Sequence, residues 1–218
     1  MRTRVKICCI SSIQEAQTAI KHGADALGLV GPMPSGPGVL SDDQIAQIVP
    51  TIPPPIATFL LTSETDTSAI ITHHQRVHTN TIQIVDALSS GTYKHIRETL
   101  PTIKLVQVLH VLGEQTIDEA LEVAQYVDAI LLDSGNPNLA IKELGGTGRT
   151  HNWQVSKRLV EAVNVPVFLA GGIKTENVRE AIEMVQPYGL DLCSSVRTNG
   201  KLDEWKLEAF FEAVYTIF

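Results

Sequence analysis

The sequence has little cysteine and no excess of positive charge. Its 218 residues include three cysteines: Cys8, Cys9 and Cys193. An odd number with an adjacent pair is a poor disulfide framework, so we expect reduced thiols and a cytoplasmic protein. The formal net charge of -7 argues against nonspecific binding to nucleic acid or to anionic membranes.

Long hydrophobic runs are also missing. No stretch of about 18 apolar residues occurs, so no segment is expected to span a membrane. The basic start MRTRVKICCI has an apolar part too short for the central region of a signal peptide. Hydrophobic residues nevertheless make up 44% of the chain and charged residues 19%, which is typical of a globular protein. We expect residues 1–218 to form a single domain.

Short apolar segments alternate with amphipathic segments along the whole chain. Apolar runs such as AILL and VFLA suit parallel strands covered on both faces. Eight such units predict an α/β protein, a closed (β/α)8 TIM barrel; the alternative, an open doubly wound sheet, usually has fewer strands. The predicted strands are Val5–Cys8, Ala24–Val30, Ile56–Leu61, Thr81–Val85, Ile103–Leu109, Val127–Leu132, Val165–Leu169 and Leu190–Cys193. The predicted helices are Ser12–His22, Ser41–Val49, Thr67–Arg76, Thr92–Leu100, Glu114–Gln125, Trp153–Val163, Thr175–Met184 and Asp203–Phe218.

A weak internal repeat supports closure of the barrel. The segments GADALGLV, YVDAILLD and YGLDLCSS each have an aspartate just before or at the start of a strand, namely Asp25, Asp128 and Asp191. Two loops, Gly31–Leu40 and Ser134–Asn152, are much longer than the others. Both follow strands, so in a barrel both lie on the catalytic face, and loops of this length are usually functional.

Small residues gather after the sixth, seventh and eighth predicted strands. Glycine lets the backbone approach a ligand and present N–H groups to an anion, and barrels commonly bind phosphate at these strand ends. Any single glycine pair would be interpreted as a turn, but three such clusters together predict a phosphate site. Its residues are Gly145, Gly146, Thr147, Gly148, Gly171, Gly172, Ser194 and Ser195.

Two side chains at strand ends are able to do acid–base chemistry. Cys8 ends the first predicted strand and Asp133 follows the sixth. A thiolate serves as a base and a carboxylic acid as an acid when their pKa values are tuned. From spacing alone, a core cysteine and a capping aspartate are the more economical interpretations. Lys6 shares the strand parity of Cys8 and is therefore a candidate substrate-binding or phosphate-binding residue, whereas Cys9 is expected to face the helices.

Histidines offer weaker signals. His74 and His78 are four residues apart on a predicted helix, beside His73. No carboxylate or cysteine completes a zinc set, so we expect a solvated helix face and no metal site. His151, in the second long loop, is a candidate ligand contact.

Taken together, the motifs VKICCI, GADALGLV, LLDS, LGGTGRTHNW, VPVFLAGGIKTENV and GLDLCSSV resemble the phosphoribosylanthranilate isomerase family of tryptophan biosynthesis. The resemblance runs from Lys6 to about Leu207. It implies an aldose–ketose isomerase that converts an aminoaldose phosphate to an aminoketose phosphate by an Amadori rearrangement, without cofactor or metal. It also implies that Cys8 is the general base, that Asp133 is the general acid and that the glycine-rich loops and the Ser194–Ser195 turn bind the phosphate.

The sequence also departs from the family pattern. Cys9 replaces a glycine, and Gly38 stands where the family has an arginine that contacts the anthranilate. Val85 replaces a histidine. Arg149 and Arg197 are candidate substitute cations, because losing an arginine–carboxylate contact weakens substrate binding.

Three functions are compatible with these observations: the family's own reaction, the same chemistry on a different amine, and a non-catalytic sugar-phosphate-binding barrel. The retained Cys8 and Asp133 argue against the third function, since a binding protein needs neither acid nor base. The lost arginine favours the second over the first, but the matching fold and chemistry rank the first highest. The partner is a small sugar phosphate, and the protein is expected to be a monomer or homodimer.

Overall fold

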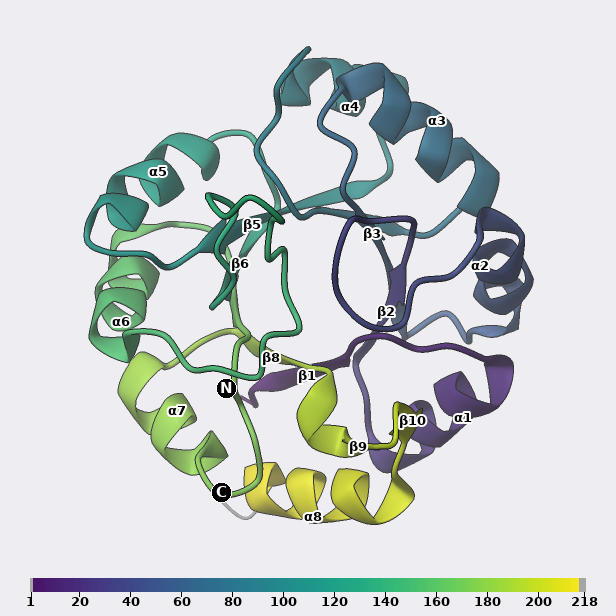
Figure 1. Ribbon diagram of the computed structural model, residues 1–218, viewed down its shortest axis with the longest axis vertical. Helices are drawn as coiled ribbons and strands as arrows, with labels where there is room; N and C mark the ends of the chain where they lie inside the picture. The colour runs from purple at the N-terminus through teal and green to yellow at the C-terminus, as the bar shows by residue number, and fades with distance from the viewer. Residues whose placement is uncertain (1, 216–218) are drawn as a thin grey trace.

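Eight parallel strands pair in the order of the chain and close into a barrel where β1 pairs with β8. The computed structural model describes residues 2–215, and in it the helices surround the barrel (Figure 1). The predicted closed barrel is confirmed, and the open sheet is excluded. The strands are β1 Arg4–Ile7, β2 Ala26–Val30, β3 Ala57–Thr62, β4 Thr81–Ile84, β5 Lys104–His110, β6 Ala129–Asp133, β7 Val167–Leu169 and β8 Gly189–Leu192. The helices are α1 Ile13–His22, α2 Asp42–Ile48, α3 Thr67–Val77, α4 Tyr93–Thr99, α5 Gln115–Val123, α6 Trp153–Ala162, α7 Val178–Val185 and α8 Glu204–Tyr215.

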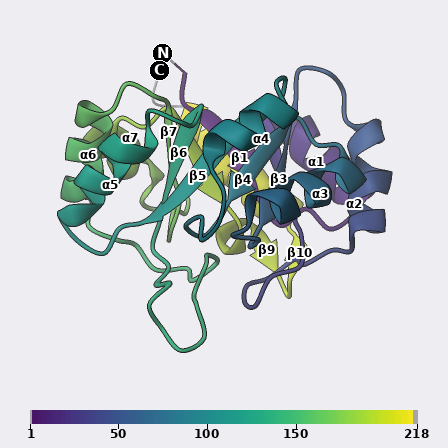
Figure 2. The ribbon, with the colours of Figure 1, turned by 90° about the horizontal axis from the view of Figure 1, so that it is seen from above.

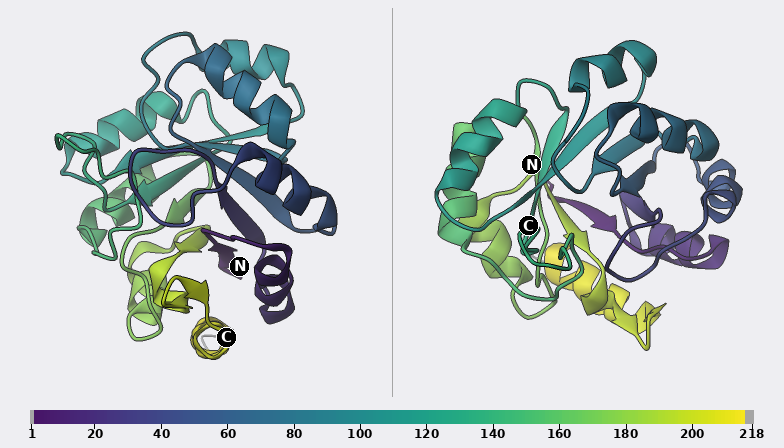
Figure 3. Two further views of the ribbon diagram at one scale, coloured as in Figure 1. Left: turned by 45° about the vertical axis from the view of Figure 1, so that its right-hand side comes forward. Right: turned by 45° about the horizontal axis from the view of Figure 1, so that its top comes forward.

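The chain after β8 contains structure that the sequence did not predict. A 3-10 turn, η2 (Ser194–Val196), leads into a two-stranded hairpin of β9 (Arg197–Thr198) and β10 (Lys201–Leu202). The hairpin, yellow in Figure 3, lies beside α8. Another short 3-10 turn, η1 (Val49–Thr51), follows α2. The last three residues of the predicted helix Asp203–Phe218 lie outside the described residues.

Local capping explains where the first helices begin and end. The Ser12 hydroxyl accepts a hydrogen bond from the Glu15 backbone N–H, and α1 ends at Gly23, whose φ of 109° favours glycine. Ser41 and Gln44 form a capping box at the start of α2. These caps fix where each helix starts, and therefore how long each loop over the barrel mouth is.

The apolar core has two parts, one inside the barrel and one around it. Ala26, Phe59, Val106 and Phe168 pack inside it, with the Phe59 and Phe168 ring centroids 6.0 Å apart. A larger apolar cluster lies between the strands and the helices. The interior is therefore packed rather than hollow, which leaves space for a ligand only at its ends.

The predicted solvated histidine face on α3 is wrong. His73 and His74 are buried. The His73 Nδ1 lies 2.9 Å from the Thr62 hydroxyl on β3, and the His74 Nε2 lies 2.7 Å from the Thr79 carbonyl oxygen. Burial lowers the pKa of both rings, which suits neutral imidazoles. His73 attaches α3 to β3, and His74 attaches it to the loop before β4. Among the described residues, no group of three or more metal-ligating side chains could hold a metal ion.

The two ends of the barrel differ. Figure 2 shows the long loops after β2 and β6 projecting from the end opposite the chain termini. That end holds the carboxyl ends of the strands, where barrel active sites form. No helix within residues 2–215 is long and apolar enough to cross a membrane.

Candidate active site

A pocket opens at the carboxyl ends of the strands, beneath the two long loops. The predicted site residues converge there from the ends of four strands, β1, β6, β7 and β8, and from the loops that follow them; the exception is Lys6, which lies deeper in the barrel. The predicted residues that line the pocket are Cys8, Asp133, Gly145, Gly146, Thr147, Gly148, Gly171, Gly172, Ser194 and Ser195.

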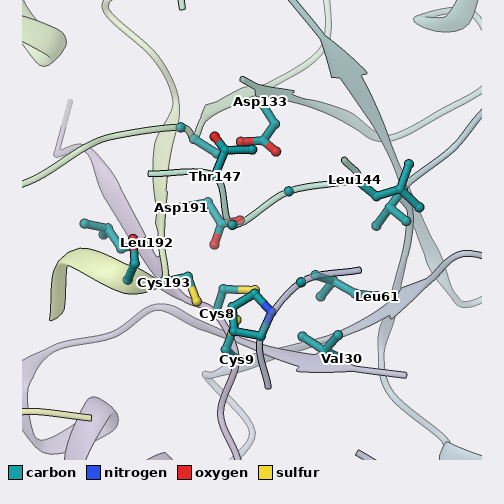
Figure 4. Close-up of a pocket in the computed structure, with 18 of the residues that line it drawn as sticks. Cys8, Cys9, Val30, Leu61, Asp133, Leu144, Thr147, Asp191, Leu192 and Cys193 are labelled. Carbon is teal, nitrogen blue, oxygen red and sulfur yellow. The ribbon is translucent and has the colours of Figure 1, made fainter. Parts of the chain in front are cut away.

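The candidate base and acid lie on opposite sides of this pocket. Figure 4 shows Cys8 on one side, Asp133 on the other and Asp191 between them. Cys8 and Asp133 are each only 5% exposed. Asp133 is the last residue of β6, and Cys8 directly follows β1. A ligand between them would have a thiol on one face and a carboxyl group on the other.

A buried ion pair lies at the bottom of the pocket. The Lys6 Nζ is 2.8 Å from the Asp191 Oδ1, and the two residues are neighbours across β1 and β8. Burial opposes the charge of Lys6, but the Asp191 carboxylate nearby raises the pKa of the amine above its usual value. The ammonium also lies 5.2 Å from the centre of the Phe59 ring. Lys6 is therefore a fixed cation inside an otherwise apolar barrel.

The Lys6 ammonium reaches the candidate base through a gap left by Gly28 on β2. A side-chain carbon at Gly28 would lie 2.8 Å from the Cys8 sulfur and 3.1 Å from the Lys6 Nζ. Both atoms thus border the same small space, which any larger residue would fill. The glycine keeps the cation and the sulfur near each other.

Asp191 was not predicted as a site residue, because the internal repeat grouped it with Asp25 and Asp128. Those two precede their strands, and each accepts a backbone N–H from the neighbouring strand, at Val5 and Leu105. Asp191 instead lies within β8 and points into the pocket. The available signal was a second charged residue within a buried strand, which needs a counterion such as Lys6.

The surroundings of Asp133 favour its protonated form. Burial raises the pKa of this carboxyl group, while the backbone N–H groups of Ser134 and Gly135 and the charges of His110 and Lys6 act in the opposite direction. Gly145 lies against it, since a side-chain carbon there would be 3.1 Å from the Asp133 Oδ2. A raised pKa makes a carboxyl group better suited to serve as a general acid.

Small residues form a cradle on one side of the pocket. Gly172 has a φ of 65°, and a side-chain carbon there would lie 2.6 Å from the Thr150 backbone nitrogen, so only glycine fits. The Thr147 and Ser134 hydroxyl oxygens are 2.6 Å apart. The buried Ser195 hydroxyl has no hydrogen-bond partner among the described residues. An unpartnered buried hydroxyl in a pocket lined by glycine backbone is a suitable site for an anion.

Comparison with known proteins agrees with this geometry. The family model for N-(5'phosphoribosyl)anthranilate (PRA) isomerase matches residues 5–213. The N-(5'-phosphoribosyl)anthranilate isomerase of Methanosarcina acetivorans is 37% identical, over 98% of this chain and 94% of that protein. The chain belongs to the PRA isomerase family.

Solved structures show the same fold. The phosphoribosyl anthranilate isomerase of Thermotoga maritima is 26% identical and superposes with a TM-score of 0.81, covering 98% of this chain and 99% of that one. Another such isomerase, in complex with reduced 1-(o-carboxyphenylamino)-1-deoxyribulose 5-phosphate, superposes with a TM-score of 0.78 at 24% identity.

Compared with the PRA isomerase pattern, the side of the pocket away from the cradle is apolar. Val30, Leu61, Val85 and Val108 line it, with Met33 from the loop after β2. Val85, which replaces the family's histidine, is buried and contributes only hydrocarbon. This side suits the flat face of an aromatic amine, but these side chains offer nothing to a carboxylate.

The prediction for Cys9 is wrong. Cys9 does not face the helices but lines the pocket. β1 ends at Ile7, and Cys9 has a φ of 61°, so the alternation of a strand does not extend to it. A hydrogen bond with the Cys193 thiol, with further contributions from Cys8 and burial, raises the pKa of Cys9. This left-handed backbone explains why a glycine suits the same position in the family pattern.

Cys9 and Gly38 both depart from the family pattern, and the two positions are in contact. A side-chain carbon at Gly38 would lie 2.6 Å from the Cys9 Cβ, and Gly38 has a φ of 76°. An arginine at position 38 therefore cannot coexist with Cys9 unless the loop after β2 moves. The side chain gained at one position excludes a side chain at the other.

Neither proposed substitute cation faces the apolar side. Arg197 is buried, its guanidinium pairs with Glu15 at 3.0 Å, and it donates to the backbone oxygens of Cys8 and Cys9. It therefore holds the end of β1 in place. Arg149 pairs with Glu143, and its own carbonyl oxygen lies beside Gly171 and Gly172 on the cradle side.

The remaining candidate contact, His151, lies outside the pocket lining. Its Nε2 is 2.8 Å from the Ser156 hydroxyl oxygen on α6. Burial lowers the pKa of this ring to about 4. His151 thus anchors the end of the long loop to α6, and the sequence did not distinguish this role from ligand contact.

Proposed function

We propose that this chain is an N-(5'-phosphoribosyl)anthranilate isomerase of tryptophan biosynthesis, with Asp133 as general acid and Cys8 as general base. The observation that carries the proposal is the pairing of a buried carboxyl group and a buried thiol across one pocket that also contains a glycine-rich cradle. Membership of the family supplies the reaction.

The acid acts first in the proposed sequence. Asp133 donates its proton to the ring oxygen of the ribose while the C1–O bond breaks, and the amine nitrogen supplies the electron pair that forms an iminium ion. Burial raises the pKa of Asp133, which supports this role. The departing oxygen becomes a hydroxyl group and remains in the substrate.

The base acts on the opened chain. Cys8 removes the proton from C2, and the electron pair of the C–H bond moves to neutralise the iminium ion. The resulting enol tautomerises to the aminoketose. The Lys6 ammonium borders the same small space as the Cys8 sulfur, so a positive charge lies next to the group that accepts the proton. Carbon C1 is reduced as C2 is oxidised within the same molecule, so the reaction needs no external oxidant or reductant. The acid and the base only transfer protons.

The cradle holds the substrate phosphate in this proposal. The residues for it are Gly146, Thr147, Gly172, Ser194 and Ser195, all of which line the pocket. An anchored phosphate would keep C1 and C2 between Asp133 and Cys8, and such positioning contributes much of the rate enhancement of enzymes.

One observation favours a second candidate, the same chemistry on a different amine. Within the described residues, the pocket lining contains no lysine or arginine side chain to meet the carboxylate of anthranilate. An amine without a carboxylate would fit the apolar side formed by Val30, Leu61 and Val85. The sugar-phosphate chemistry would be unchanged.

The oligomeric state and the cellular compartment are each proposed from a single observation. A solved relative from Thermotoga maritima is described as a dimeric isomerase, so a monomer or homodimer is proposed here. The three free thiols support a reducing, cytoplasmic compartment.

The test is the fluorescence loss that accompanies consumption of phosphoribosylanthranilate by the purified protein, with growth rescue of a tryptophan auxotroph beside it. We expect turnover and rescue. Turnover of a phosphoribosyl amine without a carboxylate, and none of phosphoribosylanthranilate, would favour the second candidate. No turnover of either compound would leave a binding protein as the better account.

A further inference from the structure

Within residues 2–215, the pocket lining does not provide a cation for the carboxylate of the proposed substrate. Its aromatic ring bears a carboxylate, and a carboxylate that enters an apolar site needs a cation or hydrogen-bond donors. The carboxyl groups that line the pocket, Asp133 and Asp191, offer no positive charge to a carboxylate. Because no lysine or arginine side chain lines the pocket within the described residues, a cation for the carboxylate would come from the rim.

Three cations near the pocket are already committed. Lys6 is fully buried and paired with Asp191, and Arg197 is buried against Glu15. Arg149 lies on the cradle side, where its carbonyl oxygen borders Gly172. None of these three side chains lines the pocket within the described residues.

Lys142, in the long loop after β6, contacts two segments that border that apolar side. Its carbonyl oxygen accepts a hydrogen bond of 2.6 Å from the hydroxyl of Ser35, which lines the pocket from the loop after β2. Its ammonium pairs with Asp86, the residue that follows the pocket-lining Val85. Lys142 is thus tied to both edges of the apolar side.

The loop that carries Lys142 also contributes a residue to the pocket lining. Glu143 forms an antiparallel bridge with Asn136, so the chain is extended there. In extended chain, residues two apart lie on the same side, which gives Lys142 the side of Leu144. Leu144 is buried and lines the pocket.

We propose that Lys142 is the specificity-determining residue that binds the carboxylate of the substrate's aromatic amine. The inference rests on the proposed function for the identity of that amine. An ammonium group has three donors, so Lys142 keeps its contact with Asp86 while it binds the ligand. Its side chain is 48% exposed, which leaves a face of the ammonium open to a ligand.

Binding measurements with two probes test this assignment. The first probe is reduced 1-(o-carboxyphenylamino)-1-deoxyribulose 5-phosphate, and the second is the same compound without the ring carboxylate. Calorimetric titration of Lys142→Met is expected to show affinity for the first probe lowered at least about tenfold and affinity for the second changed less than about twofold, the scale of a lost charged contact. Lys142→Arg is expected to retain the preference for the first probe.

The matched control is Arg149→Met, which removes a cation from the same loop. It is expected to change the affinities for both probes by similar factors. The assignment is overturned if Lys142→Met weakens both probes equally or neither, if Arg149→Met alone removes the preference, or if the unmodified protein does not prefer the carboxylated probe.

These titrations need no turnover, so they separate this inference from the proposed function. A Lys142-dependent preference in a protein that does not consume phosphoribosylanthranilate would support the carboxylate site and refute the isomerase. Consumption of phosphoribosylanthranilate with no effect of Lys142→Met would do the opposite.

Discussion

Replacing Lys6 with methionine would measure how much the buried Lys6–Asp191 ion pair contributes to the stability of the fold. The Lys6 ammonium is fully buried and lies 2.8 Å from Asp191. Methionine has a similar length and no charge, so Lys6→Met leaves the Asp191 carboxyl group buried without its partner. Removing one member of a buried ion pair typically costs about 3–5 kcal/mol.

Proton uptake by Asp191 limits that loss of stability. The ordinary pKa of this carboxyl group is 3.8, so protonating it at pH 7 costs about 4 kcal/mol, at about 1.4 kcal/mol per pH unit. Burial already raises the pKa of Asp191 in the folded parent, against the effect of the Lys6 charge, and removing Lys6 raises it further. The stability of the variant therefore falls as pH rises toward the new folded pKa. We expect a loss of about 3–4 kcal/mol at pH 7 that becomes small near pH 4.

Urea unfolding followed by circular dichroism from pH 4 to pH 8 measures this dependence. The double variant Lys6→Met with Asp191→Leu is expected to recover much of the loss, since no carboxyl group is then left unpaired. Lys21→Met, which removes an exposed partner of Glu204, serves as the control and is expected to show no pH-dependent loss. A loss for Lys6→Met below about 1 kcal/mol at pH 7, or an equal loss at pH 4 and pH 7, would refute the reasoning.

Three further expectations concern other residues. Asp133→Asn should raise the melting temperature at pH 7–8, because burial raises the pKa of Asp133 and the ionised form destabilises the fold; a gain that persists unchanged below pH 3.8 would contradict this. Gly38→Arg should destabilise the protein by about 1–3 kcal/mol in urea unfolding, and by less in a Cys9→Gly background; strictly additive effects would show that the two positions are independent. His151→Gln should lose less stability than the parent as pH falls from 6.5 to 4, because the folded pKa of His151, about 4, lies below its ordinary value of 6.5 and the neutral ring stabilises the fold above that range. Melting temperatures of variant and parent that fall in parallel over this range would contradict this expectation.

Much of the fold follows from the sequence, because parallel strands buried on both faces appear as apolar runs. The barrel topology in turn predicts that Cys8, Asp133 and the glycine-rich loops lie close together, since the ends of eight parallel strands meet at one face of a barrel. That prediction depends only on the positions of these residues just after strands.

The parts that the sequence did not predict depend on backbone conformation and on tertiary contacts. Strand parity assigned Cys9 to the wrong face, because the chain turns left-handed directly after β1. The two buried histidines of α3 match the pattern of a polar helix face, yet Thr62 and Thr79 supply their partners only in the folded protein. Lys142 sits in a long loop whose path over the barrel mouth no sequence pattern specifies.

The central claim, an acid and a base on opposite sides of one pocket, is tested most directly by steady-state kinetics of Cys8→Ala and Asp133→Asn on phosphoribosylanthranilate. Each variant is expected to lose at least about a hundredfold in kcat, the scale of a lost general acid or base, while its affinity for the reduced product analogue stays near that of the parent. Cys9→Ala is the control: it removes a thiol from the same pocket, but one whose pKa is raised, and it should lose less than about tenfold. Near-normal turnover by Cys8→Ala, or equal losses for Cys8→Ala and Cys9→Ala, would contradict the account.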